Sequence, residues 1–416
     1  MAGGGVAGVA AAISASELGA DVIIAEGTGG LAPNRSLFSG LLSGESTSTS
    51  VVKADPGDLA ERLGIDVRFG EPVLSVDVAS RSARTKSGRI RFDSLVVATG
   101  SSYGREDLKG ASKQGVFFLG ALEDYTALSG ALDHASRLAV IGPIPLALPV
   151  AEAASQKTQV SVFLGGGILS GFARRAIQRI SEAASSRRVS LVLERAEAIV
   201  GVRRAEAVIS AGAVHPCDRV AVLPRSSPSP PSLDCARGDH GGLLVDASMR
   251  TSCTSVFAAG DCAEQRIGSG TAVARLQSSS LTMGTVAGIN SEGGAAKASL
   301  SRCAAFVAFG VELCSAGVDA ELARAVGLDA VEFESHDAPA GVEASLVYDR
   351  TTHRLYGAQF SGPGSLALSD CASLAVAFGA SLEDLAYQET PYLPRRGRDR
   401  SPICLTAGMA LAQPRG

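Results

Sequence analysis

The stretch Gly3-Gly4-Gly5-Val6-Ala7-Gly8 opens the chain, and a helix of small residues and an apolar strand that ends at Glu26 follow it. Its glycines are spaced G-x-G-x-x-G: the first permits a tight turn, the second lets the backbone approach a pyrophosphate, and the third lets helix and strand pack closely. Glu26 lies 18 residues after Gly8, near the spacing of about 20 at which a carboxylate accepts hydrogen bonds from a ribose. Gly3, Gly5, Gly8 and Glu26 therefore predict a dinucleotide-binding βαβ unit.

Only Met1 and Ala2 precede this turn, although a turn of this kind is normally fed by a strand of several apolar residues. Two explanations remain open at this point. Either the first residue is internal to a longer gene product, or the sheet lacks its central strand, which would cost much of its stability.

A second pairing of glycine and acid stands in Phe257-Ala258-Ala259-Gly260-Asp261. Asp261 follows an apolar strand and precedes a stretch that favours a helix, so its carboxylate can hold a sugar hydroxyl while neighbouring amides face phosphate. An N-cap aspartate after a glycine turn is the alternative. Because the two signals fit opposite parts of one adenine dinucleotide, their pairing predicts bound FAD.

A third turn, Gly142-Pro143-Ile144-Pro145-Leu146-Ala147, follows the apolar strand 138–141 and starts a second βαβ pattern. It keeps one glycine of the three, and Pro143 and Pro145 each remove an amide donor. The next strand, 160–164, ends in Leu164-Gly165 without an acid for a ribose. We therefore predict that NAD(P)H binds weakly or not at all at this second unit.

Composition excludes several other classes of function. A net charge of −4 gives no basic field for nucleic acid, and no run of about 18 uncharged apolar residues could form a transmembrane helix. The five histidines do not cluster with cysteines or acids, so no metal site is predicted. The first residues lack the features of a signal peptide, and the cytoplasm is the predicted location.

All eight cysteines lie at or beyond Cys217, and none forms a C-x-x-C pair. Scattered thiols of this kind are predicted to be small buried side chains without redox chemistry. Cys262, next to Asp261, is predicted to be a packed core thiol as well.

In these features the chain resembles the two-dinucleotide-binding-domain flavoproteins of the pyridine nucleotide-disulfide oxidoreductase family. The matching pieces are the glycine turn with Glu26, Leu95-Val96-Val97-Ala98-Thr99-Gly100, and Met249-Arg250-Thr251-Ser252 through Asp261. Beyond residue 300 the chain is similar to the dimerisation domain of the NADH oxidase and coenzyme A disulfide reductase branch, in Val347-Tyr348-Asp349, Tyr356-Gly357-Ala358-Gln359 and Tyr392-Leu393-Pro394.

The resemblance implies an α/β fold with two Rossmann-like FAD/NAD(P)-binding domains and a C-terminal α+β dimerisation domain. The FAD-binding domain would be discontinuous, at 1–110 and 236–298, with the NAD(P)-binding-like domain at 111–235 and the dimerisation domain at 299–416. Strand patterns at 345–348 and 355–360 independently predict a hairpin in the last part. The expected assembly is a homodimer.

Roles for single residues follow from the same resemblance. Gly3, Gly5, Gly8 and Glu26 would hold the ADP half of FAD, Ala98, Thr99, Gly100 and Gly260 would line the dinucleotide, and Asp261 would hold the ribityl chain. Tyr392 matches a tyrosine that reaches the partner subunit's flavin, with a packing role as the alternative. Disulfide-reducing members carry a redox cysteine where this chain has Ser39 or Gly40, and neither can form a thiolate.

The implied activity is that of an FAD-dependent oxidoreductase, which passes electrons through flavin to a small-molecule or protein acceptor without the family's redox cysteine. The resemblance implies NAD(P)H as a second cofactor, against the altered turn at Gly142. Two alternatives stay open. The first is a flavin-binding or assembly subunit without pyridine-nucleotide activity, which Pro143 and Pro145 favour. The second is a cysteine-free reductase of an iron–sulfur carrier.

Overall fold

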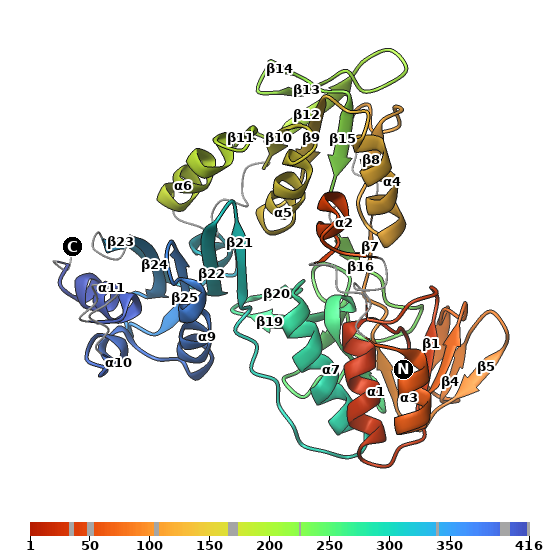
Figure 1. Cartoon of the computed structure of the whole chain (residues 1–416). Coiled ribbons are helices and arrows are strands. Elements are labelled where there is room, and N and C mark those ends of the chain that lie inside the picture. The colour runs from red at the N-terminus through yellow and green to blue at the C-terminus, as the bar shows by residue number, and fades with distance from the viewer. Residues whose placement is uncertain are drawn as a thin grey trace. The chain divides into compact units, whose positions relative to one another are not determined.

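The structure is a computed structural model, and it describes residues 1–32, 37–47, 54–103, 108–164, 174–223, 226–337, 341–391 and 400–413 (Figure 1). The chain forms two compact units, each of which is described by itself. The first unit comprises Met1–Arg35, Ser48–Gly104 and Ser226–Leu300, and the second comprises Ser36–Thr47, Arg105–Arg225 and Ser301–Gly416.

The first unit is a parallel sheet with helices packed on it and short antiparallel strands around it. Its helices are α1 (Val6–Ser16), α3 (Pro56–Leu63), α7 (Gln277–Ser291) and the 3₁₀ turn η3 (Gly260–Cys262). Its strands are β1 (Ile23–Glu26), β2 (Asp66–Phe69), β3 (Ser75–Asp77), β4 (Ser82–Arg84), β5 (Arg89–Arg91), β6 (Leu95–Val97), β7 (Ser101–Tyr103), β16 (Ser226–Pro228), β17 (Leu243–Val245), β18 (Val256–Ala258), β19 (Ala263–Ile267) and β20 (Gly270–Ala272). The main sheet has the order β2, β1, Ala2, β6, β18, because Ala2 bridges in parallel to both Ala25 and Val97.

Met1 and Ala2 lie between β1 and β6, and Ala2 forms isolated parallel bridges to both strands. The Ala2 amide donates to the Val96 carbonyl at 2.9 Å, and the Ala25 amide donates to the Met1 carbonyl at 2.9 Å. The α-amino group of Met1 donates to the Ile23 carbonyl at 2.5 Å. Because backbone groups pair on both sides, two residues are enough to join β1 to β6.

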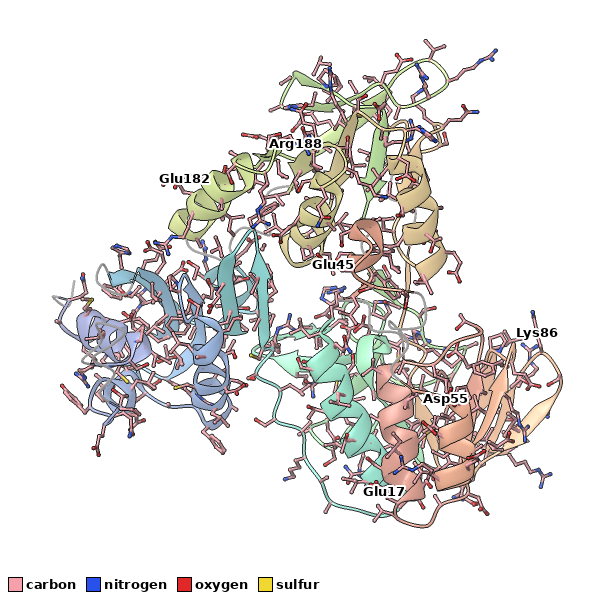
Figure 2. The ribbon with its side chains drawn as sticks, viewed as in Figure 1. Glu17, Glu45, Asp55, Lys86, Glu182 and Arg188 are labelled. Carbon is pink, nitrogen blue, oxygen red and sulfur yellow. A yellow bond between two sulfur atoms is a disulfide. The ribbon has the colours of Figure 1, made fainter. Side chains whose placement is uncertain are left out.

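The helices of the first unit follow from local sequence features. α3 begins after Asp55, whose carboxylate accepts hydrogen bonds from the amides of Gly57 and Asp58, as expected of an N-cap residue (Figure 2). α1 and α7 lie side by side on the sheet (Figure 1). A side chain at Gly284 of α7 would run into the Ala7 carbonyl oxygen of α1, so this glycine permits the close approach of the two backbones.

The described part of the second unit contains three sheets, two of five strands and one of three. Its helices are α2 (Gly40–Ser43), α4 (Leu122–Leu132), α5 (Ile144–Ser155), α6 (Arg174–Ser185), α8 (Ala320–Ala325), α9 (Ser369–Phe378), α10 (Leu382–Ala386) and α11 (Pro402–Leu411). The strands before residue 226 are β8 (Val116–Phe118), β9 (Arg137–Ile141), β10 (Gln159–Phe163), β11 (Val189–Val192), β12 (Ala196–Val200), β13 (Ala207–Ser210), β14 (Ala213–Pro216) and β15 (Arg219–Val222). Those that follow are β21 (Ala304–Ala308), β22 (Val311–Gly317), β23 (Ala330–Asp337), β24 (Val342–Asp349) and β25 (Leu355–Ser361).

The two five-stranded sheets of the second unit differ in strand direction. The first is parallel throughout, with the order β11, β10, β9, β15, β8, and an antiparallel group of β12, β13 and β14 accompanies it. The second is antiparallel, with the order β21, β22, β25, β24, β23. The predicted hairpin is confirmed as β24 and β25. Residues 105–225 and 301–416 belong to one compact unit while each range keeps its own five-stranded sheet, and the three-domain division stays a prediction.

Two absences hold for the described part of the chain. None of its helices is both long enough and apolar enough to cross a membrane. Within the same ranges, no three or more histidine, cysteine, aspartate or glutamate side chains are grouped so that they could hold a metal ion.

Candidate dinucleotide-binding site

The glycine turn after Ala2 has the geometry that its spacing predicts. Gly3 has φ of +102°, and a side chain there would lie 2.5 Å from the Ala98 carbonyl oxygen. A side chain at Gly8 would collide with the carbonyl oxygen of Gly3. Gly5 differs, because no atom lies within 4 Å of the place where its Cβ would be. The protein itself thus requires glycine at positions 3 and 8, while Gly5 leaves open space beside the start of α1, where a pyrophosphate could approach the backbone.

Glu26 ends β1 and is oriented toward this turn by hydrogen bonds to both carboxylate oxygens. Its Oε2 accepts from the Gly4 amide at 2.5 Å. Its Oε1 accepts from the amide and the hydroxyl of Thr28, at 2.7 and 2.8 Å. The side chain remains partly exposed, so a fixed carboxylate stands at the edge of the turn with lone pairs for the hydroxyls of a ribose.

The segment Ala98-Thr99-Gly100 follows β6 at the neighbouring strand end. The Ala98 amide donates to the Ala2 carbonyl at 2.8 Å, and the Thr99 hydroxyl donates to the Ser229 carbonyl at 2.8 Å. The strand order reverses between Ala2 and β6, since β1 and β2 lie on one side and β6 and β18 on the other. A crevice at such a reversal, outside the carboxyl ends of the strands, is where dinucleotides bind in this class of sheet.

Gly260 and Asp261 meet the same edge of the sheet. Gly260 has φ of +76°, and its backbone packs between α1 and α7, because an added Cβ would lie 3.0 Å from the Ala7 Cβ and 3.5 Å from the Ser280 hydroxyl. The Ser101 hydroxyl donates to Asp261 Oδ2 at 3.4 Å. The second sequence signal is therefore joined to the segment after β6 and to the first turn of α1.

The first unit thus brings together nine of the ten predicted cofactor-binding residues, at the carboxyl ends of adjacent parallel strands. They are Gly3, Gly5, Gly8, Glu26, Ala98, Thr99, Gly100, Gly260 and Asp261. The tenth, Tyr392, lies outside the described residues. Glu26 and Asp261 belong to one unit, as a single bound dinucleotide requires.

Sequence reasoning missed the part that α7 plays at this edge. Gly284 packs on Ala7 and Gly288 packs on Ala11, so the two helices run parallel. α7 begins at Gln277, seven residues before Gly284, whereas α1 begins one residue before Ala7. The N-terminus of α7 therefore extends about 9 Å beyond that of α1, and two positive helix ends face the same edge. The two glycines spaced by four were the signal for this packing.

The predicted position of the family's redox cysteine, Ser39 or Gly40, lies in the second unit, and the local packing favours Ser39. A side chain at Gly40 would collide with the Ser46 hydroxyl and lie 3.1 Å from the Ser46 Cβ. Ser39 precedes α2 and is half-buried, and the adjacent Phe38 packs edge-on against Tyr125. A side chain at position 40 would displace Ser46, whereas position 39 already carries one, a hydroxyl that cannot replace a thiolate.

The expectation that all cysteines are scattered buried thiols is wrong for two of them. Cys235 and Cys253 form a disulfide with their Cα atoms 5.7 Å apart. They are 18 residues apart in sequence, and the chain passes through β17 and a turn between them, which is why spacing alone did not reveal the pair. Cys253 stands before β18 and Asp261 after it, so the disulfide lies at the edge of the sheet opposite the dinucleotide-binding edge.

The six cysteines outside this disulfide are Cys217, Cys262, Cys303, Cys314, Cys371 and Cys404. Cys371 is exposed and Cys303 is half-buried, contrary to the expectation, whereas the others are buried as predicted. Desolvation by burial raises the pKa of Cys217 and of Cys314 to about 12. It also raises the pKa of Cys262. These thiols stay protonated near neutral pH and are poor nucleophiles.

The glycine turn, the fixed carboxylate and the Gly-Asp turn at one sheet edge define an FAD-binding Rossmann fold of an oxidoreductase. Residues 2–278 match the model of the family described as pyridine nucleotide-disulphide oxidoreductase. The chain belongs to this family, and it is accordingly an oxidoreductase. Members of the family depend on FAD and bind NAD(P)H, and the open space at Gly5, with Glu26 beside it, fits the pyrophosphate and ribose of FAD.

Similar proteins agree with this assignment. The chain is 26% identical over 415 residues to the NAD(P)H coenzyme A polysulfide/persulfide reductase of Pyrococcus horikoshii, which covers 94% of this chain and 93% of the relative. It is 28% identical over 247 residues to the nitric oxide reductase FlRd-NAD(+) reductase of Aeromonas salmonicida, a match over 56% of this chain and only 61% of that relative. The solved structure of an NAD-dependent persulfide reductase from A. fulgidus superposes with a TM-score of 0.86 at 25% identity, over 98% of this chain and 82% of the other.

Proposed function

We propose that this chain passes electron pairs through FAD to a small-molecule or protein acceptor without a thiol relay. The observation that supports the proposal is the contrast between the predicted FAD-binding residues, which lie together at the carboxyl ends of the first sheet, and Ser39 or Gly40 at the position where we expect the family's redox cysteine. Bound FAD supplies the two-electron redox chemistry. The protein supplies position and electrostatics.

Each part of the cradle has a defined task in this proposal. The amides at the start of α1, with the open space at Gly5, hold the pyrophosphate. Glu26 accepts hydrogen bonds from the ribose, and Asp261 orients the ribityl chain. The extended N-terminus of α7 places positive partial charge farther along the same edge.

The acceptor is the part of the proposal that the names of relatives inform. The Pyrococcus horikoshii relative is named for polysulfide and persulfide reduction, and the sequence resembles the NADH oxidase branch. Dioxygen and a small persulfide are therefore the first acceptors to test, followed by an iron–sulfur carrier protein as the alternative acceptor.

The test begins with the visible spectrum of the purified protein, which should show oxidised flavin. Anaerobic mixing with NADH and then NADPH, followed by each acceptor, measures reduction and reoxidation in turn. The proposal expects reduction by at least one nucleotide and reoxidation by at least one acceptor. Flavin that stays oxidised with both nucleotides would overturn it.

A second candidate is a flavin-binding or assembly subunit without pyridine-nucleotide activity. The geometry of the second Rossmann turn favours it, because Pro143 lacks an amide hydrogen and the Leu223 side chain packs on Gly142. This candidate predicts yellow protein that neither nucleotide bleaches.

We also propose that the chain forms a homodimer through residues 299–416. α9 carries exposed side chains at Cys371, Leu374 and Phe378, and Phe378 is 84% exposed. Their spacing places them along one face of the helix. Phe378→Ser should shift the mass measured by light scattering from dimer to monomer, whereas Val202→Ser, at an 87% exposed valine between β12 and β13, should not. A monomeric wild-type chain would contradict the proposal.

A further inference from the structure

The second Rossmann sheet has its own reversal of strand order, between β9 and β15. β10 and β11 lie on one side of β9, while β15 and β8 lie on the other. The crevice outside the carboxyl ends of β9 and β15 is therefore the place where this topology would bind a dinucleotide. Gly142 is the first residue after β9, and Leu223 is the first residue after β15.

The Leu223 side chain packs against Gly142 at the end of β9. Its amide donates to the Ile141 carbonyl at 2.8 Å, which fixes its backbone beside the end of β9. A Cβ added to Gly142 would lie 2.5 Å from the Leu223 Cβ and 3.0 Å from its Cδ1. Leu223 is only 2% exposed, so the leucine is packed over the glycine rather than turned toward solvent.

The surroundings of Leu223 lack the groups that hold phosphate and ribose. Pro143 precedes α5 and has no amide hydrogen to offer a phosphate. At the end of β10, Phe163 and Leu164 are buried apolar side chains, whereas the corresponding strand of the first unit ends in Glu26. The two positions that normally bind the dinucleotide thus carry hydrocarbon instead.

The first unit provides the matched reference. There Gly3 is the counterpart of Gly142, and a Cβ added to it would lie 2.5 Å from the Ala98 carbonyl oxygen. The residue after β6 is Ala98, whose side chain ends at Cβ, so the difference between the two turns is a leucine in place of an alanine. We infer that Leu223, together with Pro143, narrows the second switch point, so that NAD(P) binds only weakly in the β9–α5 turn and NAD(P)H reduces the flavin only at millimolar concentration. Leu223 and Pro143 are accordingly the residues that weaken nucleotide binding at this site. The inference rests on the proposed function only for the reduction of flavin and for the use of flavin as a check on folding.

The experiment is calorimetric titration of the FAD-loaded protein with NAD⁺ and NADP⁺, which do not reduce oxidised flavin. For the wild-type chain we expect a dissociation constant weaker than about 1 mM for both. The double variant Leu223→Ala/Pro143→Gly opens the crevice and restores an amide, so it should bind at least one nucleotide about tenfold more tightly or better. A micromolar constant for the wild-type chain, or no gain in the double variant, would overturn the inference.

The matched control is Leu138→Ala. Leu138 is a 1% exposed leucine in β9, near the end of the strand that lies away from the turn. It should destabilise the protein comparably and leave nucleotide affinity unchanged; an equal gain in affinity would contradict the role of Leu223. If the double variant does not fold, the dissociation constants of NAD⁺ and NADP⁺ for Pro143→Gly and for the wild-type chain still test the inference. Loss of the flavin spectrum in the wild type would instead count against the proposed function.

Discussion

The chain contains two Rossmann turns on the same topology, and they are built for different purposes. After Ala2 the turn is made of small residues, with open space at Gly5 and a fixed carboxylate at Glu26. After β9 the residue that corresponds to Ala98 is Leu223, and its longer side chain packs on Gly142. The difference teaches that a switch point is a site only when the residues around it leave room and polar groups for a ligand; otherwise it becomes core.

The two central strands also differ. In the second unit β9 is a five-residue strand, Arg137–Ile141, and its interior is buried. In the first unit the same place is held by Met1 and Ala2, and the α-amino group of Met1 lies inside the sheet.

The largest effect is expected where a side chain cannot fit in the first turn. Gly8→Val would place its Cβ against the carbonyl oxygen of Gly3, and relief of such overpacking typically costs about 1–3 kcal/mol or more. We expect loss of bound FAD together with lower thermal stability. The flavin absorbance per chain and the denaturation midpoint measure the two effects. If Gly8→Val retained its flavin, the first turn would not need glycine at this position, and the contrast with the second turn would fail.

Gly5→Ala should lower the affinity for FAD without lowering the stability of the apoprotein. The protein leaves room for this methyl group, so the apoprotein should keep its stability to within about 1 kcal/mol. The same methyl group would intrude where the pyrophosphate lies, and FAD affinity should fall about a hundredfold. As a control, Gly130→Ala in α4 also meets open space and should leave FAD binding unchanged. Equal FAD affinity in both variants would contradict the assignment of Gly5.

The buried amine of Met1 should make stability depend on pH. Desolvation lowers its pKa from 8.0 to about 5, so between these values the unfolded chain binds a proton that the folded chain does not. Stability is therefore full above pH 8 and is lost as the pH falls toward 5. At about 1.4 kcal/mol per pKa unit the loss is at most about 4 kcal/mol.

Denaturant titrations between pH 5 and 8.5 measure this slope. A chain with a few residues added before Met1 is the control, because an amide then replaces the amine and should remove most of the slope. Asp349 and Asp384, whose pKa values are lowered by hydrogen bonds from Thr352 and Ser381, lose their contributions only in more acid solution. An identical slope in the extended chain would exclude the amine as its source.

Reduction of the Cys235–Cys253 disulfide should lower the stability of the first unit without changing its FAD-binding residues. A loop of this length stabilises a protein by about 3 kcal/mol, so a reductant should lower the denaturation midpoint of the wild type. The flavin spectrum should not change, since the bond lies at the opposite edge of the sheet from Asp261. Cys371→Ser, at an exposed free thiol, should respond to reductant as the wild type does. A change in the flavin spectrum on reduction would place the disulfide at the site.

The smallest effect on stability is expected at Ser39, where we predict the position of the family's redox cysteine. Ser39→Cys exchanges side chains of similar size at a half-buried site, and the free energy of unfolding should change by less than about 0.5 kcal/mol. Gly40→Cys should destabilise more, because of the collision with Ser46. Circular dichroism melts of the two variants test this ranking, and the reverse order would assign Gly40 as the position.

Much of the candidate site was predictable because it depends on local backbone demands. A turn that approaches phosphate needs glycine, and a ribose needs a carboxylate at the next strand end, so Gly3, Gly5, Gly8, Glu26 and Asp261 were found by spacing. The hairpin of β24 and β25 was found by alternation around a turn. The altered turn at Gly142 was also visible, because proline removes an amide wherever it stands.

Other features needed the fold. Leu223 is 81 residues from Gly142 in sequence, and only the pairing of β15 with β9 brings the two together. The path of the chain through β17 likewise brings Cys235 and Cys253 together. The packing of Gly284 on Ala7 determines how far the N-terminus of α7 extends beyond that of α1.

The sequence by itself determined the class of fold, and it predicted the strand ends that would hold FAD and the lack of a cysteine near residue 39, because each follows from short-range geometry or from residue chemistry. Only the tertiary structure decided that Leu223 packs on Gly142, that Ala2 bridges β1 and β6, and which cysteines meet. These depend on contacts between segments distant in sequence, and no local pattern encodes which distant side chain will occupy a given space.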